Sequence, residues 1–278
     1  MKRTCCITMT LICLLSLSVS SVAQTRNEII KKADLYFSKD DYEGAEKLYK
    51  KAIEMSDAQS EDLYVLYTNM GTVQRRIDKK QEALASYNMA IRLNPNNVFI
   101  LNNRASLKGQ LKDYKGALSD YEQALSSEPR NTESLINRSH LYKVMGDTVA
   151  AIKDLKFILS YDPGNLPARN NYGDVLMNQG NCNEAMAIFE SLLAEHPNEP
   201  ILVNNIGEVY LKMKQYEKAM EYFNRATDIK SSYSTAYVNR GEVYMKLGKY
   251  DKAKKEFQKA IKLGDDSTRV FQLLDQCR

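Results

Sequence analysis

The chain of 278 residues has no tryptophan, only two histidines, and few glycines and prolines, at 12 and 6. So little glycine and proline excludes a Gly- or Pro-rich low-complexity chain. His140 and His196 have no cysteine or second histidine at the spacing of metal ligands. The sequence also lacks a phosphate-binding glycine run, a G-x-S-x-G turn and an H-E-x-x-H helix. We therefore expect no catalytic residue, no metal and no cofactor.

The first 23 residues differ from the rest of the chain. Lys2 and Arg3 precede an apolar stretch from Ile7 to Leu17, and a short Ser-rich zone then ends at Ala23. This order is typical of a secretory signal peptide. We predict that residues 1–23 are removed and that the mature protein is periplasmic or secreted. The alternative is an uncleaved membrane anchor, for which the stretch is short against the ~20 residues that cross a bilayer.

The mature chain is nearly neutral. Without Lys2 and Arg3, 37 basic residues remain against 35 acidic ones, a net charge of +2. Such a balance gives no reason to expect a nucleic-acid partner or an anionic membrane surface. No second apolar stretch is long enough to cross a membrane, so we expect no membrane insertion of the mature chain.

Residue types recur with a period of 34 residues, the signature of stacked structural repeats. One column consists of alanines: Ala83, Ala117, Ala151, Ala185, Ala219 and Ala253. Four residues after each alanine stands a large apolar or aromatic residue: Tyr87, Tyr121, Leu155, Phe189, Phe223 and Phe257. A column of small residues precedes them: Gly71, Ala105, Ser139, Gly173, Gly207 and Gly241.

Each repeat is predicted to be two helices joined by a short turn. Ala219, Phe223 and Ala226 fall on one helical face, where the small residues let two helices approach and the ring fills the space beside them. Proline disfavours helical backbone in the residue before it and so ends each repeat, at Pro95, Pro129, Pro163 and Pro197. A single pair buries too little surface to be stable, so neighbouring pairs must stack.

The unit with Gly207-x2-Tyr210, Ala219-x3-Phe223 and the late prolines resembles the tetratricopeptide repeat family. The resemblance implies an all-α fold, a right-handed superhelical solenoid of about seven helix-turn-helix repeats with a C-terminal capping helix. We expect a degenerate first repeat and longer loop over 24–63, a capping helix over 267–278, and six regular repeats at 64–97, 98–131, 132–165, 166–199, 200–233 and 234–266. Cys182 and Cys277 would then lie more than two repeats apart, so we expect free thiols.

An asparagine stands two residues before the small-residue column in six successive repeats: Asn69, Asn103, Asn137, Asn171, Asn205 and Asn239. We call these residues the asparagine ladder. Asparagine is a poor helix former, and its amide both donates and accepts hydrogen bonds. The ladder could therefore hold an extended peptide backbone, and the family resemblance implies that role in a concave groove. The alternative is that the amides bond neighbouring helices and shape the solenoid.

A second column suggests selectivity. Three residues after the last three ladder positions stand carboxylates, at Asp174, Glu208 and Glu242, whereas Arg75 and Arg76 stand in an earlier repeat. One hypothesis is a polarised groove that favours a ligand with basic residues toward the C-terminal end. The alternative is local pairing at i,i+4 with Lys212 and Lys246, worth only ~0.3–0.5 kcal/mol per pair.

The sequence therefore predicts an exported, non-enzymatic scaffold that binds a protein or peptide segment in its groove through the asparagine ladder. Phe99 and Ile201, early in their helices, are expected apolar anchors for that partner. One alternative is a structural assembly factor of an envelope complex that uses its convex face or its ends. Another is a non-catalytic regulatory subunit of a partner enzyme.

Overall fold

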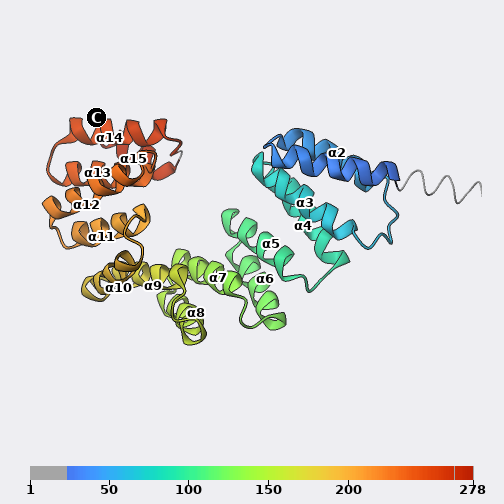
Figure 1. Cartoon of the computed structure of the whole chain (residues 1–278), viewed down its shortest axis with the longest axis horizontal. Coiled ribbons are helices and arrows are strands. Elements are labelled where there is room, and N and C mark those ends of the chain that lie inside the picture. The colour runs from blue at the N-terminus through green and yellow to red at the C-terminus, as the bar shows by residue number, and fades with distance from the viewer. Residues whose placement is uncertain (1–23, 266, 278) are drawn as a thin grey trace, which may run out of the picture. The chain divides into compact units, whose positions relative to one another are not determined.

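The computed structural model describes residues 24–265 and 267–277, so the predicted signal peptide lies outside the described residues. Every element in the described part of the chain is a helix, which confirms the all-α fold class (Figure 1). After a first helix over 24–38 come α2 (Tyr42–Glu54), α3 (Leu63–Arg76), α4 (Lys80–Leu93), α5 (Val98–Gln110), α6 (Tyr114–Ser127), α7 (Thr132–Met145), α8 (Thr148–Tyr161), α9 (Leu166–Asn178), α10 (Cys182–Glu195), α11 (Pro200–Lys212), α12 (Tyr216–Ile229), α13 (Ser234–Lys246), α14 (Tyr250–Lys262) and α15 (Thr268–Asp275).

The helices pack as successive pairs. Contacts join α3 to α4, α5 to α6, α9 to α10, α11 to α12, and α13 to α14. The first helices of neighbouring pairs also touch, as α3 touches α5 and α11 touches both α9 and α13. The first helix of a pair is therefore the element that can present one column of residues beside the next.

The chain forms two compact units, one ending at Leu141 and the other beginning at Tyr142. We call them unit 1 and unit 2. The division falls inside α7, within the predicted repeat 132–165, and nothing in the sequence pattern marks it. None of the described helices combines the length and the hydropathy that crossing a bilayer requires.

Two repeated positions set the helix boundaries. Asparagine side chains cap the starts of first helices, because Asn97 accepts a hydrogen bond from the Ile100 amide and Asn165 from the Ala168 amide. The turns inside pairs need a left-handed residue, which is glycine at Gly146, Gly180 and Gly248. At the corresponding position between α11 and α12, Lys214 takes this conformation with φ of 59°.

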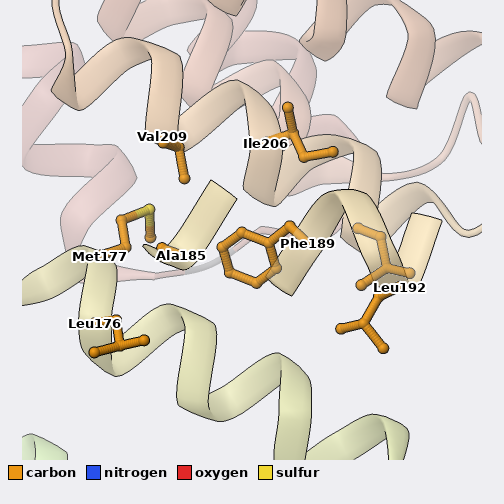
Figure 2. Close-up of a cluster of buried hydrophobic side chains, with 8 residues drawn as sticks. Leu176, Met177, Ala185, Phe189, Leu192, Ile206 and Val209 are labelled. Atoms are coloured by element: carbon orange, nitrogen blue, oxygen red, sulfur yellow. The ribbon is translucent and has the colours of Figure 1, made fainter. Parts of the chain in front are cut away.

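The apolar columns form the core. In unit 2, Figure 2 shows Leu176 and Met177 of α9, Phe189 of α10, and Ile206 and Val209 of α11 gathered into one cluster. These side chains are at most 4% exposed. Apolar burial on this scale is the main favourable term in folding, and here it joins each pair to the next pair.

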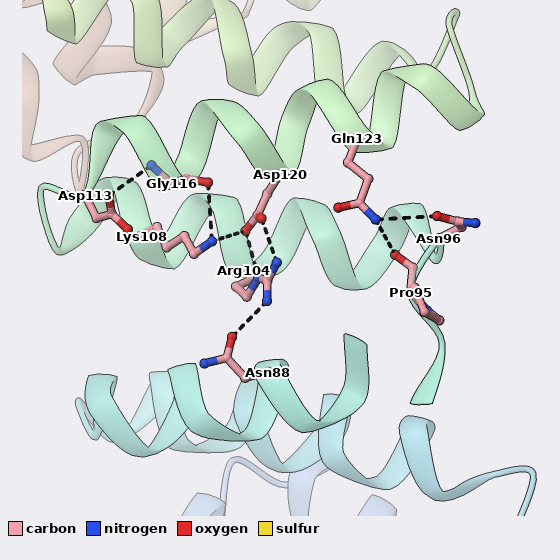
Figure 3. Close-up of polar contacts among 9 residues, drawn as sticks. All are labelled: Asn88, Pro95, Asn96, Arg104, Lys108, Asp113, Gly116, Asp120 and Gln123. Atoms are coloured by element: carbon pink, nitrogen blue, oxygen red, sulfur yellow. Dashed lines mark hydrogen bonds and ion pairs between the residues drawn. The ribbon is translucent and has the colours of Figure 1, made fainter. Parts of the chain in front are cut away.

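A partly buried polar network in unit 1, which the sequence patterns had not indicated, joins α5 to α6 through ion pairs and reaches α4 through a hydrogen bond. Arg104 of α5 donates two hydrogen bonds to Asp120 of α6, at 2.7 and 2.8 Å, and Lys108 lies 2.9 Å from the same carboxylate (Figure 3). Arg104 also reaches Asn88 of α4 at 2.8 Å. The same three places in the last repeat hold Arg240, Glu256 and Asn224, which are bonded in the same way.

Candidate functional site

The first helix of each pair presents an exposed face beside the asparagine ladder. Residues four before a ladder position share its helix face. Among them Val65, Phe99 and Ile201 are 38%, 59% and 46% exposed, far more than the core residues. Phe99 and Ile201 are thus placed where an apolar part of a ligand could contact them.

In unit 1 the ladder residues lie at the surface of α3 and α5. Asn69 lines a small pocket of about 160 Å³ together with Asp34, Phe37, Tyr49 and Thr72. The Tyr49 hydroxyl donates to Asp34 at 2.5 Å, and burial with this bond raises the pKa of Tyr49 well above its usual range. Asn103 donates to the Phe99 carbonyl of its own helix at 2.9 Å.

In unit 2 two ladder residues bond to the preceding first helix. Asn205 donates to the Asn170 side-chain oxygen at 2.8 Å, and Asn239 donates to that of Asn204 at 2.9 Å. Asn239 is 1% exposed. These two amides stabilise the stacking of first helices, the role given by the structural alternative. For Asn137 of unit 1 and Asn171 of unit 2, both partly exposed, the described residues provide no side-chain partner.

Asparagines that directly precede two of the ladder positions are buried. Asn102 and Asn204 are 2% and 1% exposed. The Asn102 oxygen accepts from the Ser134 hydroxyl at 2.7 Å, while its amide nitrogen has no hydrogen-bond partner among the described residues. The signal was present in the sequence as the doublets Asn102-Asn103, Asn170-Asn171 and Asn204-Asn205.

The three predicted carboxylates meet at one open pocket of about 730 Å³ in unit 2, which we call the α11–α13 pocket. Its lining comprises Asp174, Asn178, Glu208, Leu211, Lys212, Lys214, Tyr216, Asn239, Glu242, Lys246 and Arg269. The structure thus brings together residues that are 34 apart in the chain. It also adds residues from the turn after α11 and from α15.

The carboxylates of this pocket have partners other than the nearby lysines. Asp174 lies 2.5 Å from Lys143 and accepts from Asn178 at 3.1 Å. Glu242 lies 2.5 Å from Arg269 of α15. Within the described residues, neither Lys212 nor Lys246 forms the predicted i,i+4 ion pair, so local pairing is not what holds these carboxylates.

Glu208 bonds to amides instead of cations. It accepts from Asn204 at 2.8 Å and from Asn239 at 2.7 Å. Burial raises the pKa of Glu208, against the opposing effect of the two amides, and the Asp174 charge adds to the rise. Burial therefore favours the protonated form of this carboxyl group more than it would for an exposed glutamate.

The predicted basic residues lie elsewhere. Arg75 is partly buried and Arg76 exposed near the end of α3, in unit 1. Burial raises the pKa of Tyr87, and the Arg75 charge opposes that rise. Because the two ends of the predicted polarised groove belong to different units, that groove stays a prediction.

Few of the described residues are candidates for thiol chemistry or for metal binding. Cys182 and Cys277 are free and partly buried. In the part of the chain that the structure describes, no three His, Cys, Asp or Glu side chains are grouped as a metal site would require.

Comparisons with known proteins agree with the geometry. Family models described as tetratricopeptide repeats match residues 21–96, 100–131, 144–206 and 234–267, and one described as a TPR repeat matches 207–248. Among curated proteins none matches the chain.

Solved structures give the same fold. A tetratricopeptide repeat protein from Parabacteroides merdae ATCC 43184 is 31% identical, with a TM-score of 0.84, over 91% of this chain and 99% of that one. PilW, described as a widely conserved type IV pilus biogenesis factor, is 20% identical with a TM-score of 0.61, over 76% of this chain and 98% of PilW. At that identity the second likeness shows the fold alone.

Proposed function

Because this chain belongs to the tetratricopeptide repeat family, whose fold is typical of protein–protein interaction, we propose that it is an exported, non-catalytic scaffold that binds an extended segment of a protein partner. The segment lies on the exposed faces of the first helices. Asn69, Asn103, Asn137 and Asn171 contact its main chain. Apolar side chains such as Phe99 and Ile201 contact its side chains.

The observation that carries this proposal is the contrast within the ladder. Asn205 and Asn239 use their amides to bond neighbouring helices, whereas Asn137 and Asn171 stay partly exposed without a side-chain partner in the described residues. A stacking role accounts for the first two asparagines and leaves the second two without one. An amide with a free donor and acceptor can pair with both polar groups of an extended peptide.

The test is cross-linking of the mature protein to its partner in the native envelope, compared between variants. We expect Asn137→Ala with Asn171→Ala to abolish the cross-linked partner while the thermal unfolding temperature stays unchanged. Asn183→Ala, at an exposed position of α10 outside the ladder, is the matched control and should keep the partner. A double variant that retains the partner, or that unfolds, contradicts the proposal.

The same experiment separates the alternative of an assembly factor that docks through one end of the array. Such a protein would keep its partner in the double variant and lose it when Phe271 of α15, which is 45% exposed, becomes Ala. Export is checked on the same material by N-terminal sequencing. We expect the chain to start at Gln24, and a retained Met1 would make the N-terminal segment an anchor.

A further inference from the structure

We propose that the α11–α13 pocket receives acidic side chains from within the bound segment. This inference rests on the proposed function and names the charge of the partner. The column of carboxylates in the sequence suggests a basic ligand, whereas this proposal makes the ligand acidic.

Two of the three carboxylates of the pocket are already paired with cations. Asp174 is paired with Lys143, and Glu242 with Arg269. Glu208 accepts two amide hydrogen bonds and is driven toward its neutral form by burial. At Asp174 and at Glu242 a basic ligand would therefore have to displace an existing ion pair to gain a new one.

The lysines of the pocket are the groups left without partners. Lys212, Lys214 and Lys246 line it, all three are exposed, and the described residues contain no carboxylate or acceptor bonded to them. These three ammonium groups outnumber Glu208, the one carboxylate of the pocket without a cationic partner, so the pocket has a net positive charge. Charge complementarity of this kind selects a partner of opposite sign.

Helix position alone does not account for this cluster. Lys212 and Lys246 stand in the last turns of α11 and α13, where a cation interacts favourably with the helix dipole. Lys214 lies outside the helix, at a left-handed turn position that is glycine in the two neighbouring repeats, at Gly180 and Gly248, and Asp78 or Lys112 in two earlier repeats. The Lys214 side chain adds the third ammonium group to the pocket.

The experiment uses three labelled peptides of equal length, capped at both ends, that differ only in carrying glutamate, glutamine or lysine at the same internal positions. Binding to the mature chain is followed by fluorescence anisotropy at low and at high salt. We expect the glutamate peptide to bind most tightly, by about tenfold over the glutamine peptide, and to lose that advantage at high salt as charges are screened. An uncapped glutamine peptide tests whether a terminal carboxylate alone suffices, and we expect it to bind no better than its capped form.

The variants identify the pocket. Lys212→Ala with Lys246→Ala should remove the preference for glutamate, and Lys212→Glu with Lys246→Glu should transfer it to the lysine peptide. The matched control is Lys255→Ala with Lys262→Ala on α14, which removes the same charge from exposed positions outside the pocket, one of them also in a last turn. This control should keep the preference, which excludes a mere effect of net charge.

Each contrary result has a distinct meaning. The proposal of an acidic ligand is wrong if the glutamine or lysine peptide binds as tightly as the glutamate peptide, or if the pocket and control variants behave alike. Either result leaves the proposed scaffold function intact. If the uncapped glutamine peptide binds as tightly as the glutamate peptide, the pocket binds the carboxylate of a chain end, and the proposal that it receives side chains from within a segment is wrong. If none of the peptides binds at any salt, the proposed segment-binding function is overturned as well.

Discussion

At the scale of single residues, the small-residue column is set by the aromatic ring that faces it. A Cβ placed on Gly207 would lie 2.6 Å from the Phe223 ring, and one on Gly241 would lie 2.4 Å from the Phe257 ring. Both rings are fully buried, so they cannot move aside without disturbing the core. The glycines are therefore required for close packing, although glycine is a poor residue inside a helix.

We expect Gly207→Ala to lower the free energy of unfolding by about 1–3 kcal/mol through overpacking, despite the better helix propensity of alanine. Gly109→Ala in α5 is the control, because its Cβ would meet only Leu141, at 3.7 Å. That change should raise stability by about 0.5–1 kcal/mol. Urea denaturation followed by circular dichroism measures both, and equal effects of the two substitutions would contradict the packing argument.

At the scale of elements, α11 and α13 are joined by a polar cluster as well as by apolar packing. Glu208 of α11 accepts the Asn239 amide of α13, and Asn204 connects to both side chains. Burial raises the pKa of Glu208 above its ordinary value of 4.5. A carboxyl group of this kind binds its proton more tightly in the folded state than in the unfolded one.

This shift gives stability a defined dependence on pH. Below the ordinary pKa of Glu208 the folded state has no penalty from this group, and the penalty grows as pH rises from there through the raised folded pKa. Glutamine keeps an acceptor for both amides without the charge. We therefore expect Glu208→Gln to be at least as stable as the natural protein at neutral pH and to lose less stability between weakly acidic and neutral pH.

The measurement is the free energy of unfolding by urea at several pH values. Glu217→Gln, at an exposed position of α12, is the control and should leave the pH dependence unchanged. A Glu208→Gln protein that loses stability at neutral pH, with an unaltered pH profile, would show that the ionised carboxylate stabilises the cluster.

At the scale of the whole molecule, stability is distributed along the chain. Apart from contacts between successive first helices, the helices found in contact are neighbours in sequence order, as α12 is of α11 and α13. In such an array the stability is close to a sum of repeat and nearest-neighbour contributions. Damage in one repeat should therefore remain local.

We expect Ala219→Val, which overpacks a fully buried position of α12, to speed amide hydrogen exchange in α11, α12 and α13. Exchange in α3 to α6 should stay as in the natural protein. Hydrogen exchange read by mass spectrometry resolves these segments. An equal rise in every helix would mean that the chain unfolds as one cooperative unit.

The asparagine ladder shows how far sequence reasoning extends toward a site. The ladder asparagines are 34 residues apart, so each has the same position within its repeat and lies on the first helix of that repeat. This spacing does not say which amides are satisfied by neighbouring helices. That depends on side-chain contacts between repeats, which differ between Asn171 and Asn239 although the two share a column.

The ion pairs show the same limit. Arg104 and Asp120 are 16 residues apart on different helices, and their bond follows from how α5 lies on α6. Likewise Glu242 of α13 forms an ion pair with Arg269 of α15, although Lys246 stands four residues after Glu242 on the same helix. Residue spacing along one helix does not predict an ion-pair partner that belongs to another helix.

By itself the sequence determined the repeat, the pairing of helices and the residues of the core, because a period of 34 forces the same apolar face to recur and apolar burial does not depend on direction. Only the tertiary structure decided which polar groups remain free. Hydrogen bonds and ion pairs are short and directional, so the partners of Asp174, Glu208 and Glu242, and the isolation of Lys212, Lys214 and Lys246, depend on where neighbouring helices place their side chains.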